Sequence, residues 1–234
     1  MKKTKKVKEN EQKIAYYEEV TKRKWHKNAT VLNCSFSRLT VLPELPSELK
    51  ELYCYNNNLE VLPKLPLGLE ILECFCNGLK VLPELPPGLT ELNCTYNRLE
   101  VLPELPLGLT EFYCYNNRLE VLPELPPGLK TLYCCSNQLS VLPKLPNNLK
   151  IFDCSNNLLE VYIEIEGDDF YKYKSIGFIA GKSKYVRMGC FLRLLEDWKR
   201  NFWNNDKEFP NDNSEKSNNR YKRFLEIKNY LDKY

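Results

Sequence analysis

The chain has 234 residues, of which 43% are hydrophobic and 28% charged, and its net charge is +3. This length allows one or two domains with a sizeable core, and no apolar run approaches the roughly 18 residues that a membrane span needs. The basic N-terminus lacks the apolar stretch of a secretory signal, so we expect an intracellular protein whose ten cysteines are free thiols.

The charge is unevenly distributed along the chain. Residues 1–28 carry 10 basic and 4 acidic groups, residues 29–160 carry 9 and 15, and residues 161–234 carry 15 and 12. Phosphate backbones are bound by clustered Lys and Arg, so the acidic centre argues against nucleic acid as a partner. The basic arm could touch nucleic acid or anionic lipid weakly, but we favour a solvated helix or tail.

The N-terminal segment, residues 1–28, is interpreted as a basic arm followed by a capping helix. Within residues 11–25, "EQKIAYYEEVTKRKW", Ile14, Tyr17, Thr21 and Trp25 recur at helical spacing. We expect this helix to cover the first unit of the repeat described next.

Residues 29–160 contain seven copies of a twenty-residue pattern, LxxLxCxxNxLxVLPxLPxx, as in residues 49–68. Such a fixed period indicates a stack of structural repeats. The cysteine of the pattern, the column cysteine, recurs at Cys34, Cys54, Cys74, Cys94, Cys114, Cys134 and Cys154. The asparagine recurs at Asn57, Asn77, Asn97, Asn117, Asn137 and Asn157, with Ser37 in the first repeat.

Each fixed position has a physical reason. Alternation in LxxLxC sends Leu and Cys to one face, as a strand of three to five residues requires. The Asn amide can both donate to and accept from backbone groups that the following turn removes from the ladder. The two prolines of VLPxLP exclude a helix, so the return segment should be polyproline-like.

The repeats must stack to be stable. A repeat offers about seven apolar side chains at roughly 1.5–3 kcal/mol each when buried, whereas ordering its backbone costs about 1–2 kcal/mol per residue. Burial against both neighbours reverses this balance, and the two end repeats then need caps.

These residues resemble the leucine-rich repeat, in the LPxLP form similar to bacterial secreted effectors and to some repeat proteins of large DNA viruses. The resemblance implies an α/β repeat fold, a curved solenoid with parallel strands on its concave face and polyproline-like segments on its convex side. It also implies protein binding, and a host-cell cytoplasm is one location that fits. One departure is Cys where those effectors carry Val or another aliphatic residue.

The column cysteines are interpreted as core. Cys is small and hydrophobic, and a ladder spreads the sulfurs at about 4.8 Å per rung rather than converging them on one metal ion. We therefore expect no metal site, and a reducing compartment disfavours disulfides. The remaining thiols, Cys76, Cys135 and Cys190, are expected to be exposed.

The variable positions next to the buried strand residue carry the candidate binding surface. Aromatic side chains at a solvent face favour binding, because Tyr and Trp dominate interface hot spots. We predict one aromatic patch with acidic residues beside it and two arginines at its edge. Its members are Tyr53, Tyr55, Phe75, Tyr96, Tyr113, Tyr115 and Tyr133, with Glu51, Glu91 and Glu111, and with Arg98 and Arg118. The alternative is that the tyrosines only stabilise the sheet as cross-strand pairs.

Residues 161–234 differ from the repeats. Residues 161–186 mix β-branched and aromatic residues and predict a strand or hairpin. A helix is predicted over 189–203 from the helical spacing of Phe191, Leu194, Leu195, Trp198 and Phe202. The polar residues 204–219 predict a flexible loop. A second helix is expected over 220–234, with one apolar side formed by Phe224, Ile227, Leu231 and Tyr234. This segment is either a cap or a recruitment module.

No catalytic arrangement is visible. Some effectors with similar repeats carry a ubiquitin-ligase domain with a catalytic cysteine, but here the last 74 residues hold only Cys190 and no histidine. The lone His26 has no second histidine or nucleophile beside it. We therefore expect no enzyme, cofactor or metal, and predict a module that binds a protein or peptide. The alternative is an adaptor that recruits a second partner, for example degradation machinery, through its terminal helices.

Overall fold

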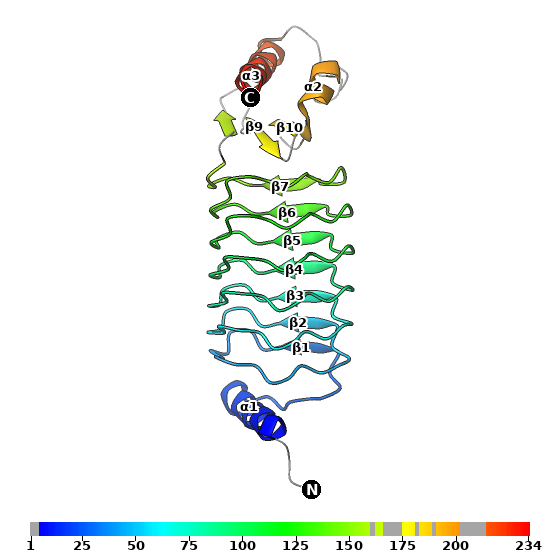
Figure 1. Ribbon diagram of the computed structural model, residues 1–234, viewed down its shortest axis with the longest axis vertical. Helices are drawn as coiled ribbons and strands as arrows, with labels where there is room; N and C mark the ends of the chain where they lie inside the picture. Colours follow the sequence, from blue (N-terminus) through cyan, green and yellow to red (C-terminus); the bar gives the residue numbers. More distant parts are fainter. Residues whose placement is uncertain (1–4, 160–161, 166–174, 181–182, 189–190, 202–213) are drawn as a thin grey trace. The chain divides into compact units, whose positions relative to one another are not determined.

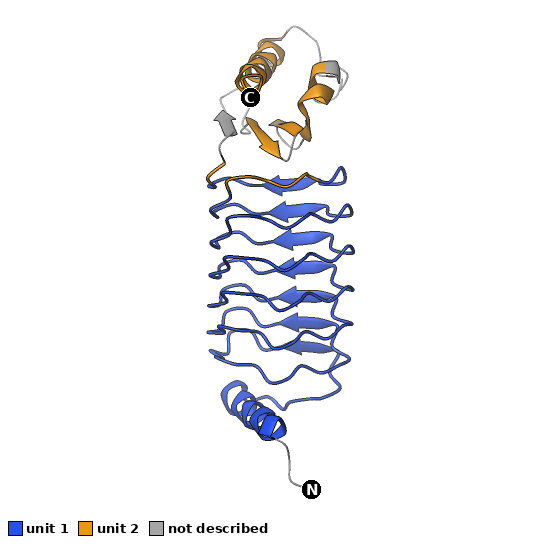
Figure 2. Ribbon diagram, in the orientation of Figure 1, with its two compact units in different colours: residues 1–139, 146–157 blue, residues 140–145, 158–234 orange. Residues whose placement is uncertain are grey.

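The computed structural model describes residues 5–159, 162–165, 175–180, 183–188, 191–201 and 214–234. The chain divides into two compact units, shown in Figure 2. Unit 1 comprises residues 1–139 and 146–157, and unit 2 comprises residues 140–145 and 158–234.

Unit 1 begins with α1 (Lys5–Thr21). The predicted helix therefore exists, but it begins earlier than residue 11 and ends before Trp25. It ends because Lys22 takes a left-handed conformation, with φ of 57°. Trp25 instead folds back onto Tyr17, which is 1% exposed, with ring centroids 4.9 Å apart.

Polar contacts fasten α1 to the first repeat. The Glu44 backbone N–H donates to Asn10 Oδ1 at 2.7 Å, and the hydroxyls of Tyr16 and Thr40 lie 3.1 Å apart. Lys6 pairs with Glu44 at 3.0 Å. These contacts hold the helix against the first repeat.

Seven three-residue strands form the parallel sheet of unit 1, in chain order (Figure 1). Each strand pairs with the equivalent residues of the next repeat, so the register repeats every twenty residues. The strands are β1 (Val31–Asn33), β2 (Glu51–Tyr53), β3 (Ile71–Glu73), β4 (Glu91–Asn93), β5 (Glu111–Tyr113), β6 (Thr131–Tyr133) and β7 (Ile151–Asp153).

The alternation predicted for LxxLxC is confirmed. The central strand residue, Leu or Phe, is buried in every repeat, and the column cysteines are at most 1% exposed. Burial raises the pKa of the column thiols of the first six repeats, to about 12 at Cys34 and Cys94. The structure therefore places the column cysteines in the core. Cys76 and Cys135 are half-buried rather than exposed, and Cys190 lies outside the described residues.

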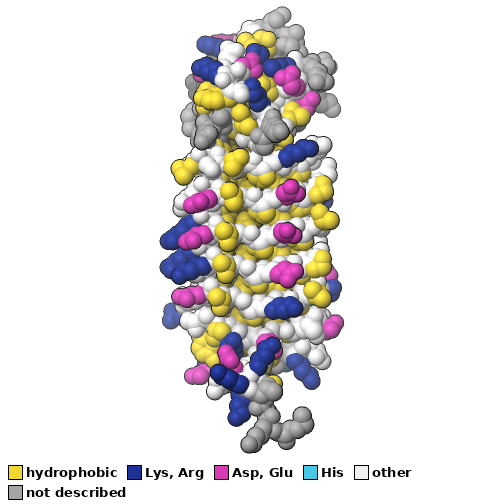
Figure 3. Space-filling view, in the orientation of Figure 1, with side chains coloured by type: hydrophobic (Ala, Val, Ile, Leu, Met, Phe, Trp, Pro, Cys, Tyr) yellow, Lys and Arg dark blue, Asp and Glu magenta, His cyan; other side chains and the backbone are white. Residues whose placement is uncertain are grey.

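The LPxLP segments form neither helix nor strand in the array, because proline removes backbone donors and holds the chain extended. The second proline has a further role, since its carbonyl accepts from the leucine three residues later, as in Leu69 N–H to Pro66 O at 3.1 Å. That bond turns the chain toward the next strand. Figure 3 shows one face of the molecule, on which apolar side chains run along the repeats between columns of charged side chains.

The asparagines form the predicted ladder. Asn137 Nδ2 donates to the carbonyls of Cys114 at 3.0 Å and Cys134 at 3.1 Å, and its Oδ1 accepts from Leu119 N–H at 3.1 Å. The same bonds recur at Asn57, Asn77, Asn97, Asn117 and Asn157. Each amide thus ties its own repeat to the one before it.

The residue before each of the six ladder asparagines, and before Ser37 in the first repeat, adopts a left-handed conformation with φ between 51° and 55°. Asn56, Asn116 and Asn156 tolerate it because an amide side chain is short and polar. For Phe36 and Tyr96 this left-handed conformation is unfavourable, because bulky side chains disfavour a positive φ.

Unit 2 contains an antiparallel sheet of order β11-β10-β9-β8. Its strands are β8 (Tyr162–Ile165), β9 (Ser175–Ala180), β10 (Ser183–Met188) and β11 (Phe191–Leu194). The predicted hairpin corresponds to β9 and β10. The helix predicted over 189–203 is wrong for residues 191–194, which pair with β10, and right for α2 (Leu195–Asn201); residues 189–190 and 202–203 lie outside the described residues.

The last helix, α3 (Glu215–Leu231), starts inside the stretch predicted as a flexible loop. Ser214 explains its start, because its hydroxyl accepts from Ser217 N–H and caps the helix; residues 204–213 of that predicted loop lie outside the described residues. The core of unit 2 joins both helices to the sheet, and Trp198 Nε1 donates to Val186 O at 2.8 Å. This core consists of Val186, Met188, Leu195, Trp198, Phe224, Ile227 and Leu231. Tyr234, expected on the same side, is 63% exposed.

Candidate functional site

The candidate site is the outward surface of the parallel sheet, which we call the strand face. It consists of the first and third residues of each strand and the residue after each column cysteine. The predicted tyrosines and Phe75 are half-buried there, and Tyr96, at the following turn position, is 51% exposed.

Contacts between rings join all the predicted aromatic residues except Tyr53 into two groups. In the first group, Phe36 meets Tyr55 edge-on at 5.4 Å between centroids, and Tyr55 stacks on Phe75 at 4.4 Å. Asn93 and Thr95 of the fourth repeat occupy the positions that hold Tyr113 and Tyr115 in the fifth repeat, and they separate the two groups.

The second group joins four tyrosines of repeats four to six. Tyr96 meets Tyr115 edge-on at 5.3 Å, Tyr115 meets Tyr133 at 6.5 Å, and Tyr113 stacks on Tyr133 at 5.6 Å with 12° between the ring planes. Stacking across strands therefore holds Tyr113 and Tyr133 parallel.

Acidic side chains orient two of the tyrosines. Tyr53 donates to Glu51 Oε2 at 2.7 Å, and Tyr113 donates to Glu111 Oε2 at 2.8 Å. The hydrogen bond to Glu51 raises the pKa of Tyr53 to about 12, and burial together with Glu111 raises that of Tyr113. Both phenols therefore remain protonated donors.

A carboxyl pair, Glu73 and Glu91, lies between the two ring groups. Burial and the neighbouring Glu91 raise the pKa of Glu73 to about 7, although Asn93 Nδ2 donates to Glu73 Oε2 at 3.0 Å. We predicted Glu91 as a site residue but not Glu73. The signal was available, since Glu73 occupies the same outward strand position as Tyr53 and Tyr113.

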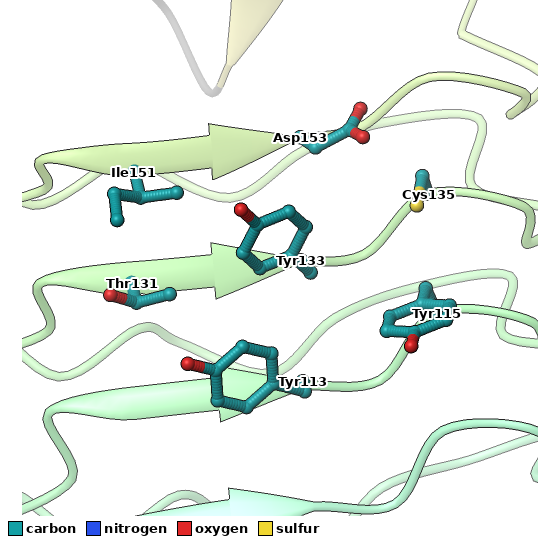
Figure 4. Close-up of a pocket in the computed structure, with 7 residues that line it drawn as sticks. All are labelled: Tyr113, Tyr115, Thr131, Tyr133, Cys135, Ile151 and Asp153. Atoms are coloured by element: carbon teal, nitrogen blue, oxygen red, sulfur yellow. The ribbon is translucent and has the colours of Figure 1, made fainter.

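The second ring group lines an open pocket of about 460 Å³ (Figure 4). Tyr113 from β5 and Tyr133 from β6 present parallel rings, with Tyr115 beside them after β5. The pocket lining also includes Thr131, Cys135, Ile151 and Asp153, none of which we predicted.

The pocket carries one carboxylate. Asp153, from β7, accepts from Ser155 N–H through Oδ1 at 2.9 Å. Burial and the nearby Asp153 raise the pKa of Cys135 to about 11, so this thiol is protonated at neutral pH.

The two predicted arginines, Arg98 and Arg118, are exposed in the turns after the strand face. Their backbone N–H groups donate to Leu79 O at 2.8 Å and Leu99 O at 2.9 Å. Within the described part of the chain, no three His, Cys, Asp or Glu side chains come together as metal ligands would. No described helix has the length and apolar character for crossing a membrane.

Comparison with known proteins places the repeats among those of bacterial effectors. No family model and no curated protein matches the chain. Among solved structures, YopM from Yersinia enterocolitica is 41% identical over 64% of this chain, with a TM-score of 0.57, and this chain spans 33% of its length. A Shigella effector leucine-rich repeat domain is 27% identical over 66% of this chain and 78% of its own, with a TM-score of 0.51. With seven parallel strands at twenty-residue spacing, the chain is a leucine-rich repeat protein of the bacterial effector type.

Proposed function

We propose that the strand face binds a protein or peptide partner, without catalysis. The leucine-rich repeat fold of effector type supports a protein-interaction module in general. The observation that carries the specific proposal is the open pocket of about 460 Å³ lined by Tyr113, Tyr115 and Tyr133. Concave sites with aromatic walls and a few polar groups are typical of binding surfaces.

A role in stabilising the sheet does not explain why every aromatic residue of the strand face is there. Stacking of Tyr113 on Tyr133 contributes to the sheet, and that role coexists with binding. Tyr96, however, leaves 51% of its surface exposed and occupies a left-handed backbone position that disfavours a bulky residue. An exposed ring at an unfavourable position supports selection for contact with another molecule.

The experiment compares partner capture from cell lysate by the full chain and by a Tyr113→Ala, Tyr133→Ala variant. We expect the variant to lose most of the captured partner while its far-UV circular dichroism spectrum stays the same. A matched control is Leu67→Ser with Leu107→Ser, because these side chains are 74% and 81% exposed on the return segments. Equal capture by the tyrosine variant and this control would refute binding at the strand face.

A second candidate function is an adaptor that recruits another protein, such as degradation machinery, through its C-terminal helices. One observation favours it: residues 158–234 form most of a compact unit with its own core, centred on Trp198 and Phe224. A folded body offers more surface than a pair of capping helices would need.

The adaptor is tested on exposed residues of α3. Lys222→Glu with Glu226→Lys reverses two exposed charges and preserves the net charge. We expect loss of one subset of captured partners and retention of those that depend on Tyr113 and Tyr133. An unchanged set of partners would refute the adaptor role and favour a capping role for this unit.

A further inference from the structure

The pocket on the strand face combines aromatic rings with a negative charge. Three phenol rings and the carboxylate of Asp153 surround it, together with Thr131, Cys135 and Ile151. A neutral apolar side chain would use the rings but would desolvate the negative charge of Asp153 without supplying an opposite charge, because the Ser155 N–H that donates to Asp153 is neutral. The faces of aromatic rings attract cations, and ring cages of this kind hold ammonium and guanidinium groups.

The charged side chains at the outward positions of the strand face are all negative. The three outward positions in each of the seven repeats hold Glu51, Glu73, Glu91, Glu111 and Asp153 but no lysine or arginine. Lys130 precedes β6 and Arg118 follows β5 in the sequence, and Arg23 Nη1 donates to Asn33 O of β1, the first strand of the sheet. A partner that lies along the strand face therefore meets carboxylates at its centre, which favours a positively charged segment.

One hydrogen bond strengthens the attraction of the rings for cations. Tyr113 donates to Glu111 at 2.8 Å, and a phenol that donates to a carboxylate carries more electron density in its ring. The ring of Tyr133 stacks on that of Tyr113 on one side, and β6 pairs Tyr133 with Asp153 of β7 on the other. The face of Tyr133 toward Asp153 is thus where a cation would meet both a ring and a carboxylate.

We propose that the pocket binds an arginine or lysine side chain of an extended basic peptide segment, whose remaining positive charges face the glutamates of the strand face. The inference rests on the proposed function, because it names the chemistry of the partner for the same surface. Apolar, acidic and nucleic-acid partners are the alternatives that the experiment separates.

The probe is a fluorescein-labelled ten-residue peptide that alternates arginine and serine, and its binding to the full chain is measured by fluorescence anisotropy. Two companion peptides carry citrulline, which keeps the shape of arginine without its charge, or glutamate in place of arginine. We expect the arginine peptide to bind about tenfold more tightly than the citrulline peptide and to weaken as salt rises, and the glutamate peptide not to bind.

Variants then locate the charge recognition. Tyr133→Leu keeps an apolar side chain but removes the ring, and Asp153→Asn keeps the acceptor for Ser155 but removes the charge. Each should reduce the tenfold arginine preference to about twofold or less, and Tyr133→Phe should retain a larger share of it than Tyr133→Leu. Leu107→Ser, outside the strand face, should leave the preference intact. Circular dichroism identifies any variant that fails to fold.

Two results would overturn the inference. Equal affinity for the arginine and citrulline peptides, or no binding of the arginine peptide, would show that the pocket does not select a cation. A preference that survives both Tyr133→Leu and Asp153→Asn would place the recognition elsewhere. Neither result bears on the lysate experiment with Tyr113→Ala and Tyr133→Ala, so failure of the basic-peptide inference is distinguishable from failure of strand-face binding.

Discussion

At the residue scale, the ladder asparagines bind the repeats to one another through otherwise unpaired backbone groups. Asn137 is 8% exposed and connects Leu119 N–H with the carbonyls of Cys114 and Cys134. A buried backbone group that loses its partner costs about 1–3 kcal/mol. The amide of Asn137 therefore stabilises the fold chiefly because it keeps these buried backbone groups hydrogen-bonded.

Asn137→Ala should destabilise the chain by about 2–4 kcal/mol, because it leaves one backbone donor and two carbonyls without their amide partner. The measurement is the urea midpoint of unfolding followed by circular dichroism. Gln138→Ala is the matched control, because Gln138 is adjacent and exposed, and its change should stay within about 0.5 kcal/mol. Similar midpoints for the two variants would contradict the role of the ladder.

Glu73 makes stability depend on pH. Its pKa is raised from 4.5 to about 7, so between these values the folded state holds a proton that the unfolded state has lost. Stability should therefore be full below pH 4.5 and decline as pH rises through 7. Glu73→Gln should stabilise the chain at pH 8 by about 1–2 kcal/mol, a range that allows for screening of this half-buried group, and should have little effect at pH 4.

Urea midpoints at pH 4 and pH 8 test this prediction. Glu104→Gln serves as the control, because this carboxylate is exposed on a return segment. If Glu73→Gln and Glu104→Gln show the same difference between the two pH values, the carboxyl pair with Glu91 is not the cause.

At the scale of the elements, each three-residue strand contributes one large apolar residue and one thiol to the core. The column cysteines are buried in the core, where Cys acts as a small hydrophobic side chain. Their burial removes them from reagents, and at Cys94 it raises the pKa of the thiol to about 12.

The seven column cysteines should therefore resist maleimide in the folded chain at pH 7 and react after unfolding in urea. Mass spectrometry after proteolysis locates the label. Cys76 and Cys135, which are half-buried, should react faster than the column in the folded state. Labelling of Cys94 or Cys114 at the rate of Cys76 would show that the stack opens or that the column is not its core.

At the scale of the whole molecule, the chain has two compact units with separate cores. The core of unit 2 depends on Trp198, which is fully buried and donates to Val186 O at 2.8 Å. Unit 1 is instead a stack in which each repeat contacts its neighbours, so its stability is mainly a sum of repeat and interface contributions.

Trp198→Ala should destabilise unit 2 by about 3–5 kcal/mol through the cavity it leaves. Hydrogen exchange followed by mass spectrometry should show faster exchange in β9, β10 and α3, while the amides of β2 to β6 keep their protection. Equal loss of protection in both regions would show that the two units unfold together.

The sequence predicted more of unit 1 than of unit 2, and particular residues show why. Leu52 pairs with Leu32 and Leu72, and Asn57 bonds to backbone groups of the repeat before it, so the period alone specified which repeats these residues contact. Phe191, Leu194, Leu195 and Trp198 have helical spacing, yet Phe191 and Leu194 belong to a strand. Pairing with β10 outweighed the local pattern there, and no spacing within that segment could reveal this partner.

The candidate site divides in the same way. Its tyrosines were predictable, because the alternation of a strand determines which side chains face outward. Two features could not be predicted in this way. One is the gap between the ring groups at Asn93 and Thr95, and the other is the pocket that joins Tyr133 to Asp153 and Cys135. Both depend on how side chains of successive repeats meet in space.

What the sequence determined by itself is the repeat: the strand, the buried cysteine, the asparagine ladder and the extended return. Each of these is set by local backbone chemistry or by contacts between equivalent positions, and the period of twenty residues encodes both. Only the tertiary structure decided where Trp25 folds back, which residues become β11, and which ring faces a carboxylate. Those outcomes depend on packing between non-equivalent residues, for which no periodicity in the chain carries information.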